Sequence, residues 1–111
     1  MRKVAFWMMA VLGFGFLPGC PKHKIHPEAL KMQRLCIAHL VANRLELAEN
    51  AASVALRYNP KYVEAINCRA LVEIRRGHLR IAERMLKEAL SYESNFAQAR
   101  SNLGHIYFKQ K

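Results

Sequence analysis

The sequence predicts an all-α domain built from about two and a half copies of one helical hairpin. From residue 29 to residue 111, apolar residues recur at steps of three and four, which is the spacing of amphipathic helices. This part of the chain shows no alternation of apolar and polar residues, the pattern of a half-buried strand. The helical blocks also repeat every 34 residues, which indicates stacked units of one structure.

The repeat is clearest where residues 45–58 are compared with residues 79–92. The identical pairs are Leu45 and Leu79, Ala48 and Ala82, Glu49 and Glu83, Ala55 and Ala89, Leu56 and Leu90, and Tyr58 and Tyr92. One column of small residues continues the repeat through Cys36, Ala70 and Gly104. Small residues let two helices cross at close range. Ala48 and Ala82 are therefore expected at helix crossings.

These columns resemble the tetratricopeptide repeat, a 34-residue helix–turn–helix unit. Leu103, Gly104 and Tyr107 match its first-helix signature, and Pro60 stands in the closing turn. Arg69 in the leucine column and the lack of a signature tryptophan are departures. The resemblance implies two repeats over residues 29–62 and 63–96 and a partial repeat over 97–111.

The first helix of each full repeat is expected to end at Asn43 or Gly77. Both residue types tolerate the left-handed conformation that is common at the carboxyl end of a helix. The two turns are therefore specified by local sequence.

In the tetratricopeptide family, the first helices of successive repeats line a concave groove. Carried over column by column, the resemblance implies a partner-binding groove formed by Gln33, Ile37, Leu40, Asn67, Leu71, Ile74, Arg75, His105 and Phe108. The expected occupant is a protein helix or an extended peptide with an apolar side, which Asn67 and Arg75 could hydrogen-bond. The alternative is that these apolar residues only cover a small core.

The first residues are typical of an export signal. Arg2 and Lys3 precede an apolar run over residues 4–17, which is too short to span a hydrocarbon core of about 30 Å. The run ends in residues 17–20, Leu-Pro-Gly-Cys, which resemble the lipobox of bacterial lipoproteins, with Pro18 as a departure. The resemblance implies a signal peptide over residues 1–19 and lipidation of Cys20. An uncleaved anchor and an ordinary secretory signal are the alternatives.

The residues after Cys20 are expected to form a lipidated tether over 20–28, bracketed by prolines. Pro21, in place of aspartate, is compatible with sorting to the outer membrane. The expected location is therefore the cell envelope, with the domain anchored by lipid and facing the periplasm.

The chain is strongly basic, with 18 lysine and arginine residues against 8 acidic residues and a formal net charge of +10. Loss of Arg2 and Lys3 with the signal lowers this charge from +10 to +8. Export argues against nucleic acid as a partner. A basic face is expected from Arg76, Arg80, Arg84 and Lys87. It is either a solvated surface paired with nearby glutamates or a docking surface for acidic protein or anionic lipid.

Catalysis finds no support in the sequence. The chain contains no aspartate and none of the serine, phosphate-loop or zinc-protease motifs. No cofactor or metal is expected, since His23 and His26 lie in the tether and fit a solvated pair better than a metal site. Cys36 and Cys68 could pair in an oxidising compartment or pack as small buried residues, and their apolar helical surroundings favour the second interpretation.

A lipid anchor joined to a short helical array resembles the pilotin-type lipoproteins, which assist secretin assembly in type IV pilus and related secretion systems. The expected function is thus protein binding or assembly in the envelope. One rival is a structural envelope protein that contacts the cell wall or anionic lipid through its basic face. Another is a shortened gene product, whose uncovered Ile106, Tyr107 and Phe108 would favour self-association.

Overall fold

The computed structural model describes residues 24–111, and this part of the chain contains five α-helices and no strand. The helices are α2 (Pro27–Val41), α3 (Leu45–Tyr58), α4 (Val63–Arg75), α5 (Leu79–Tyr92) and α6 (Ala97–Lys109). The all-α prediction is confirmed. The predicted signal peptide and the lipidation site at Cys20 lie outside the described residues.

The helix starts follow the period found in the sequence. Helices α3 and α5 each have 14 residues, and their starts at Leu45 and Leu79 lie 34 positions apart. Helices α4 and α6 each have 13 residues and start at Val63 and Ala97, again 34 positions apart. The 34-residue period of the sequence therefore also separates the starts of these two pairs of helices.

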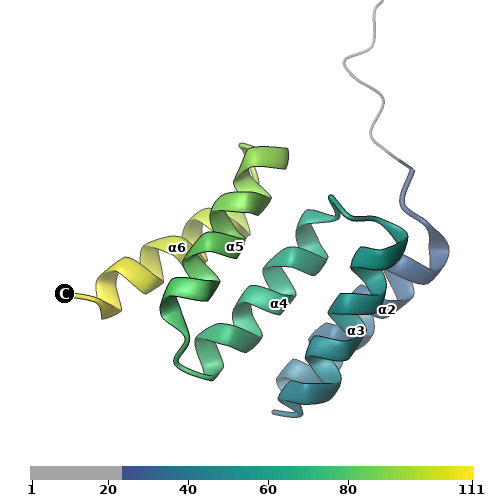
Figure 1. Cartoon of the computed structure of the whole chain (residues 1–111), viewed down its shortest axis with the longest axis horizontal. Coiled ribbons are helices and arrows are strands. Elements are labelled where there is room, and N and C mark those ends of the chain that lie inside the picture. Colours follow the sequence, from purple (N-terminus) through teal and green to yellow (C-terminus); the bar gives the residue numbers. More distant parts are fainter. Residues whose placement is uncertain (1–23) are drawn as a thin grey trace, which may run out of the picture.

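Neighbouring helices along the chain pack in pairs, and α4 lies between the α2–α3 pair and the α5–α6 pair (Figure 1). Helix α4 also contacts both α2 and α6. Within residues 24–111, no Cα atom of α3 lies within 8 Å of a Cα atom of α5. Helices α2, α4 and α6 thus form a continuous row, and α3 and α5 pack on it separately.

Two turns have the same backbone geometry, one between α2 and α3 and the other between α4 and α5. Asn43 has a φ of 57° and Gly77 a φ of 82°, and both follow a first helix. The next residue in each turn, Arg44 or His78, donates its N–H to the carbonyl five residues earlier, at 2.8 Å and 2.9 Å. This bond satisfies a carbonyl that the helix end leaves free. The local prediction for both turns is confirmed.

Small residues fill the helix crossings, as the repeat columns indicated. The predicted crossings at Ala48 and Ala82 are fully buried, and so are Cys36 and Ala70 in the small-residue column. One core cluster lies among α2, α3 and α4, and a second lies among α4, α5 and α6 around Leu86. The helices can approach closely at these positions because the side chains there are small.

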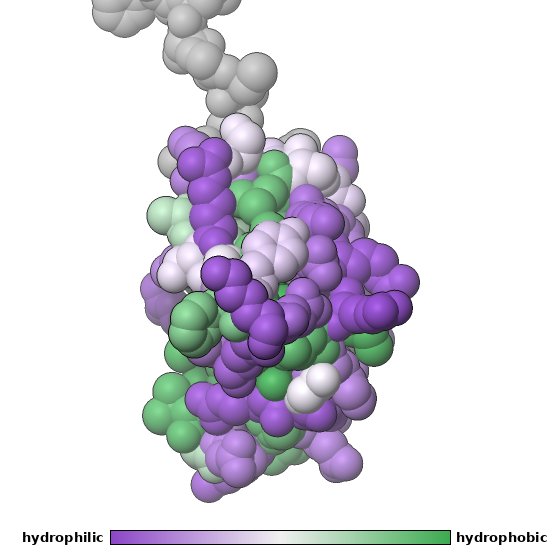
Figure 2. All heavy atoms as spheres, turned by 90° about the vertical axis from the view of Figure 1, so that its left-hand side faces the viewer, coloured by the Kyte–Doolittle hydropathy of each residue, from purple (hydrophilic) through white to green (hydrophobic). Residues whose placement is uncertain are grey.

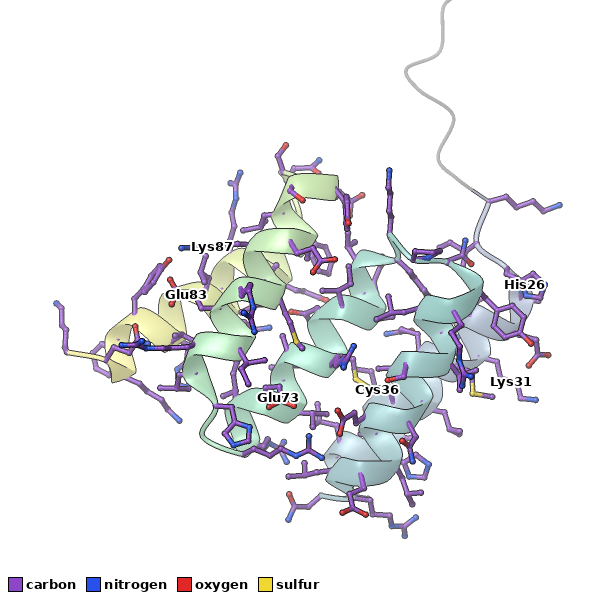
Figure 3. All side chains as sticks on the ribbon, viewed as in Figure 1. His26, Lys31, Cys36, Glu73, Glu83 and Lys87 are labelled. Atoms are coloured by element: carbon purple, nitrogen blue, oxygen red, sulfur yellow. A yellow bond between two sulfur atoms is a disulfide. The ribbon has the colours of Figure 1, made fainter. Side chains whose placement is uncertain are left out.

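Cys36 and Cys68 form a disulfide between α2 and α4, with their Cα atoms 6.5 Å apart (Figure 3). Both side chains are fully buried. The favoured interpretation, two unpaired core residues, was right about burial and wrong about pairing. The bond forms where α2 and α4 pack against each other.

The domain begins earlier than the repeat columns implied. Pro27 is the first residue of α2, where its missing N–H costs no hydrogen bond. His26 caps this helix, because its Nδ1 accepts the N–H of Glu28 at 3.1 Å. The His26 N–H donates to Oδ1 of Asn59 at 2.8 Å, and its ring stacks on Tyr58 with centroids 4.5 Å apart. His26, expected in the tether, is part of the fold.

Candidate partner-binding surface

The exposed side of α2 carries an apolar strip. Ile37 is 37% exposed and Val41 is 78% exposed, and Leu30 lies seven residues before Ile37 on the same helix face. Gln33 is half-buried beside them. Of the predicted groove residues on α2, Ile37 is thus accessible and Gln33 is partly so.

Leu40 and Asn67 are buried, and Ile74 is half-buried against the neighbouring helices. Leu40 belongs to the core cluster among α2, α3 and α4, and Ile74 packs against the cluster among α4, α5 and α6. Asn67 is only 5% exposed, and its Oδ1 accepts a hydrogen bond from Asn102 of α6 at 2.8 Å. These three residues of the predicted groove hold the helices together.

The accessible residues of α4 and α6 continue the row. Leu71 is half-buried, whereas Arg75 and His105 are exposed. Arg75 Nη1 donates to the Leu40 carbonyl at 3.1 Å, which ties α4 to the carboxyl end of α2. Phe108 is 75% exposed, but its counterpart 34 residues earlier is Ile74, which packs toward α5. Phe108 and His105 are three residues apart on α6, so they are neighbours, with Phe108 at the position that packs toward α5 in the preceding hairpin.

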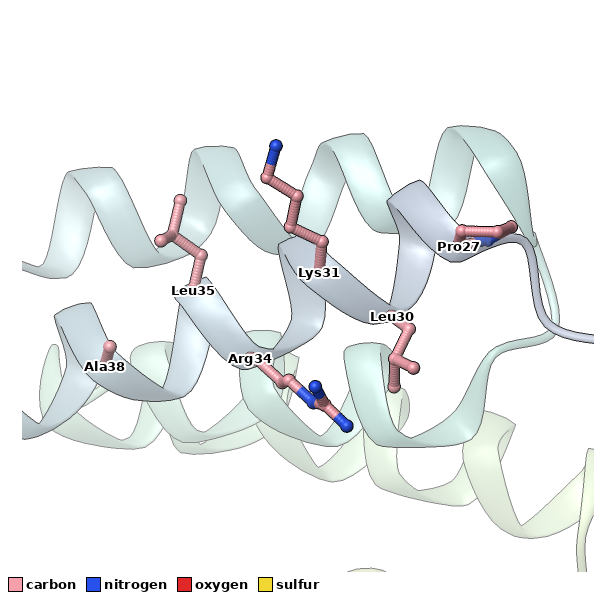
Figure 4. A pocket seen from close by; sticks show the side chains of 6 residues that line it. All are labelled: Pro27, Leu30, Lys31, Arg34, Leu35 and Ala38. Atoms are coloured by element: carbon pink, nitrogen blue, oxygen red, sulfur yellow. The ribbon is translucent and has the colours of Figure 1, made fainter.

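A shallow depression lies on the outer side of α2, where sequence analysis placed no site (Figure 4). It is lined by Pro27, Leu30, Lys31, Arg34, Leu35 and Ala38. The lining residues belong to one helix, so the depression is a surface feature and not a cleft between elements. Leu35 is 42% exposed, and Lys31 lies 3.9 Å from the Glu28 carboxylate. The lining is mainly apolar and includes the cations Lys31 and Arg34. This combination fits contact with a peptide better than binding of a buried small-molecule substrate.

Two members of the predicted basic face are bound within the protein. Arg76 Nη1 lies 2.8 Å from Glu49 and 3.0 Å from Glu73. The hydrogen bond with Glu49 raises the pKa of the Arg76 guanidinium above its ordinary value, against a smaller opposing effect of burial. Lys87 Nζ lies 3.0 Å from Glu83, and this hydrogen bond raises the pKa of Lys87 (Figure 3).

Arg80 and Arg84 are exposed on α5. Lys87 is exposed as well, although it pairs with Glu83, whereas Arg76 is half-buried and held by Glu49 and Glu73. Neighbouring glutamates thus pair with two of the four cations that the sequence groups together.

Glu73 forms the most buried ionic cluster, with its side chain 7% exposed. Its carboxylate lies 2.7 Å from Nδ1 of His78 and 3.0 Å from Arg76. Burial alone would raise the pKa of Glu73, but the hydrogen bonds with His78 and Arg76 outweigh burial and lower it below its ordinary value. The cluster joins the end of α4 to the following turn, which is a structural role.

The described residues show neither a metal-ligand group nor a membrane-spanning helix. Within residues 24–111, no three His, Cys, Asp or Glu side chains come together so that they could hold a metal ion. No helix in this range has the length and apolar character needed to cross a bilayer.

No protein-family model and no curated protein matches the sequence.

Proposed function

We propose that residues 29–111 form a tetratricopeptide-type array that acts as a protein-binding or assembly module in the bacterial cell envelope. The observation that carries this proposal is the 34-residue spacing of helices and turns, together with a row of first helices in which α4 contacts α2 and α6. In repeat arrays, such a row provides an extended binding surface.

The surface of this row favours a partner with one apolar side. Its α2 end offers Leu30, Ile37 and Val41, whereas its α6 end offers the polar side chain of His105. Arg75 lies between the two ends, with one nitrogen bound to the Leu40 carbonyl. A helix or extended segment with apolar residues toward α2 and a carboxylate near Arg75 fits this distribution.

A location in the envelope is supported by two independent features. The amino-terminal sequence resembles a lipoprotein signal that ends at Cys20. The Cys36–Cys68 disulfide is the kind of bond that persists in oxidising compartments such as the periplasm. Lipidation of Cys20 would hold the domain at a membrane, and assistance to an outer-membrane secretin, as in pilotin-type lipoproteins, is one role of this class.

The rival function, contact with the cell wall or anionic lipid through a basic face, has less support. Arg76 and Lys87 already bind glutamates of the same chain. Arg80, Arg84 and Lys87 are exposed, and such charges offer a weak electrostatic attraction, because screening limits the contribution of single exposed charges.

Partner binding is tested by a photoreactive amino acid at Ile37 of the full chain, produced in its native envelope. The matched control carries the same probe at Asn50, which is exposed on α3 outside the row of first helices. We expect one defined protein adduct from position 37 and none from position 50. Recovery of a secretin would support the pilotin-like role. Lipid adducts alone, or equal adducts from both positions, would contradict binding through this surface.

Anchoring is tested separately by Cys20→Ser in the full chain. Fatty acid incorporation should occur in the wild-type protein, respond to globomycin, and disappear in the variant, because serine offers no thiolate for lipid transfer. A lipid-free wild-type protein that remains inside the cell would contradict the envelope proposal and leave the binding surface untouched.

A further inference from the structure

Within residues 24–111, no other helix covers one face of α6. Ala97, Ser101, Gly104 and Phe108 follow one another at steps of four, three and four, so they share a side of the helix. All four are exposed, and Phe108 is 75% exposed. Seen from the α6 end, the molecule shows separate hydrophobic patches among hydrophilic side chains (Figure 2).

The same face is covered in the preceding hairpin. The residues 34 positions earlier are Val63, Asn67, Ala70 and Ile74, and each of them is buried or half-buried. Val63, Ala70 and Ile74 pack in the core cluster that includes residues of α5. The α6 face thus has the chemistry of a helix-packing surface, and within residues 24–111 no second helix lies on it.

The four residues match each other when two α6 helices run antiparallel. A register that places Ala97 of one copy opposite Phe108 of the other also places Ser101 opposite Gly104. The Phe108 ring of each copy then lies over Ala97 of the other copy. The small residues Ser101 and Gly104 face each other at the centre of the pair. A Cβ added at Gly104 would meet nothing within 4 Å, so a second backbone has room to approach there.

Charge favours this arrangement over a parallel one. Helix α6 contains Arg100 and Lys109 and no acidic residue, and Lys111 follows it. In the antiparallel pair, the lysines at the end of one copy come beside Glu93, which precedes α6 in the other copy. A parallel pair would bring the lysines of the two copies together. The helix dipoles also oppose each other in the antiparallel pair.

We propose that the face of Ala97, Ser101, Gly104 and Phe108 docks α6 of a second copy in an antiparallel, two-fold symmetric pair. Such a contact is isologous, so it closes at two copies. His105 borders this face, because it lies four residues after Ser101 and three before Phe108.

The test places a photoreactive amino acid at Ser101 of the full chain in membranes. Trypsin cuts after Arg100 and Lys109, so the probe and Gly104 lie in one peptide, 101–109. A cross-link between two copies of this peptide arises only between molecules. We expect a species of twice the monomer mass that contains this peptide pair.

The matched variants are Gly104→Glu and Gln98→Glu, which add the same charge at two exposed positions of α6. A carboxylate at 104 would be buried without a partner in the pair, so we expect about a tenfold loss of cross-linked dimer. Gln98→Glu should leave the yield within about twofold. Melting curves followed by circular dichroism show whether both variants fold. A monomer only, adducts only to other proteins, or a dimer that survives Gly104→Glu would overturn the proposal.

Discussion

The amide of Asn102 donates to Oδ1 of Asn67 at 2.8 Å and thereby joins α6 to α4. The preceding pair of first helices, α4 and α2, is joined by the disulfide between Cys68 and Cys36. Asn102 lies 34 residues after Cys68, so these two residues share a repeat position, whereas Cys36 corresponds to Ala70 and not to Asn67. The contact between α2 and α4 thus contains a covalent bond, whereas the contact between α4 and α6 contains a hydrogen bond between two asparagines.

The asparagine pair should behave as a coupled unit. Asn102→Ala leaves the amide of Asn67, which is only 5% exposed, without its partner, so we expect a loss of about 1–3 kcal/mol in the free energy of unfolding. Asn67→Ala should cost a similar amount, and the double variant should cost less than the sum. Urea unfolding of the four proteins measures the coupling. Strict additivity would show that the hydrogen bond does not contribute.

The disulfide should contribute substantially to stability. It closes a sequence separation of 32 residues, so the chain-entropy estimate for its loss is roughly 3–4 kcal/mol. Thermal unfolding of the wild-type protein with and without a reductant measures this contribution. The double variant Cys36→Ala and Cys68→Ala is the control, since a reductant should not change its melting temperature. An unchanged melting temperature of the reduced wild-type protein would refute the prediction.

Two glycines should respond in opposite directions to alanine. Gly77 has a φ of 82°, so Gly77→Ala places a Cβ in a left-handed backbone and should cost about 1 kcal/mol. Gly104 lies within α6 with open space around its missing Cβ, so Gly104→Ala should stabilise the protein by about 0.5–1 kcal/mol. Chemical unfolding at low protein concentration compares the two. A loss at both positions would show that α6 is packed at Gly104.

Much of the fold was predictable because its determinants are local or periodic. Asn43 and Gly77 mark turns through their own backbone preference, and Ala48 and Ala82 mark crossings through their size. Neither feature needs knowledge of distant contacts. The all-α class and the starts of α4 and α6 at residues 63 and 97 followed from the same columns, whereas α2 starts at Pro27 instead of residue 29.

The surface was less predictable because exposure depends on partners far away in the sequence. Asn67 was expected to face a groove, but its side chain bonds Asn102, which is 35 residues away. Arg69, a departure from the repeat columns, lies 4.0 Å from Glu49 of α3, and its Nε is buried without a hydrogen-bond partner. His26 belongs to the fold through Asn59, 33 residues away. No periodic pattern encodes these contacts.

The buried carboxylate of Glu73 should make the protein sensitive to acid. Its pKa in the folded protein is lowered from the ordinary value of 4.5, because hydrogen bonds with His78 and Arg76 outweigh burial. A group with a depressed pKa stabilises the fold above its unfolded-state pKa, and this stabilisation is lost as the pH falls through the folded-state pKa. The free energy of unfolding should therefore decline as the pH falls below about 4.5.

The variant Glu73→Gln isolates this effect, since its amide does not titrate. At pH 7 it should be less stable than the wild-type protein by about 1–3 kcal/mol, because Arg76 and His78 lose a charged acceptor. The difference should shrink as the pH falls, because the wild-type carboxylate also becomes neutral. Glu46→Gln, at an exposed position of α3, is the control and should show a much smaller effect. Denaturant melts from pH 7 to pH 3 measure both differences, and a constant gap between Glu73→Gln and the wild-type protein would show that the cluster does not tune stability.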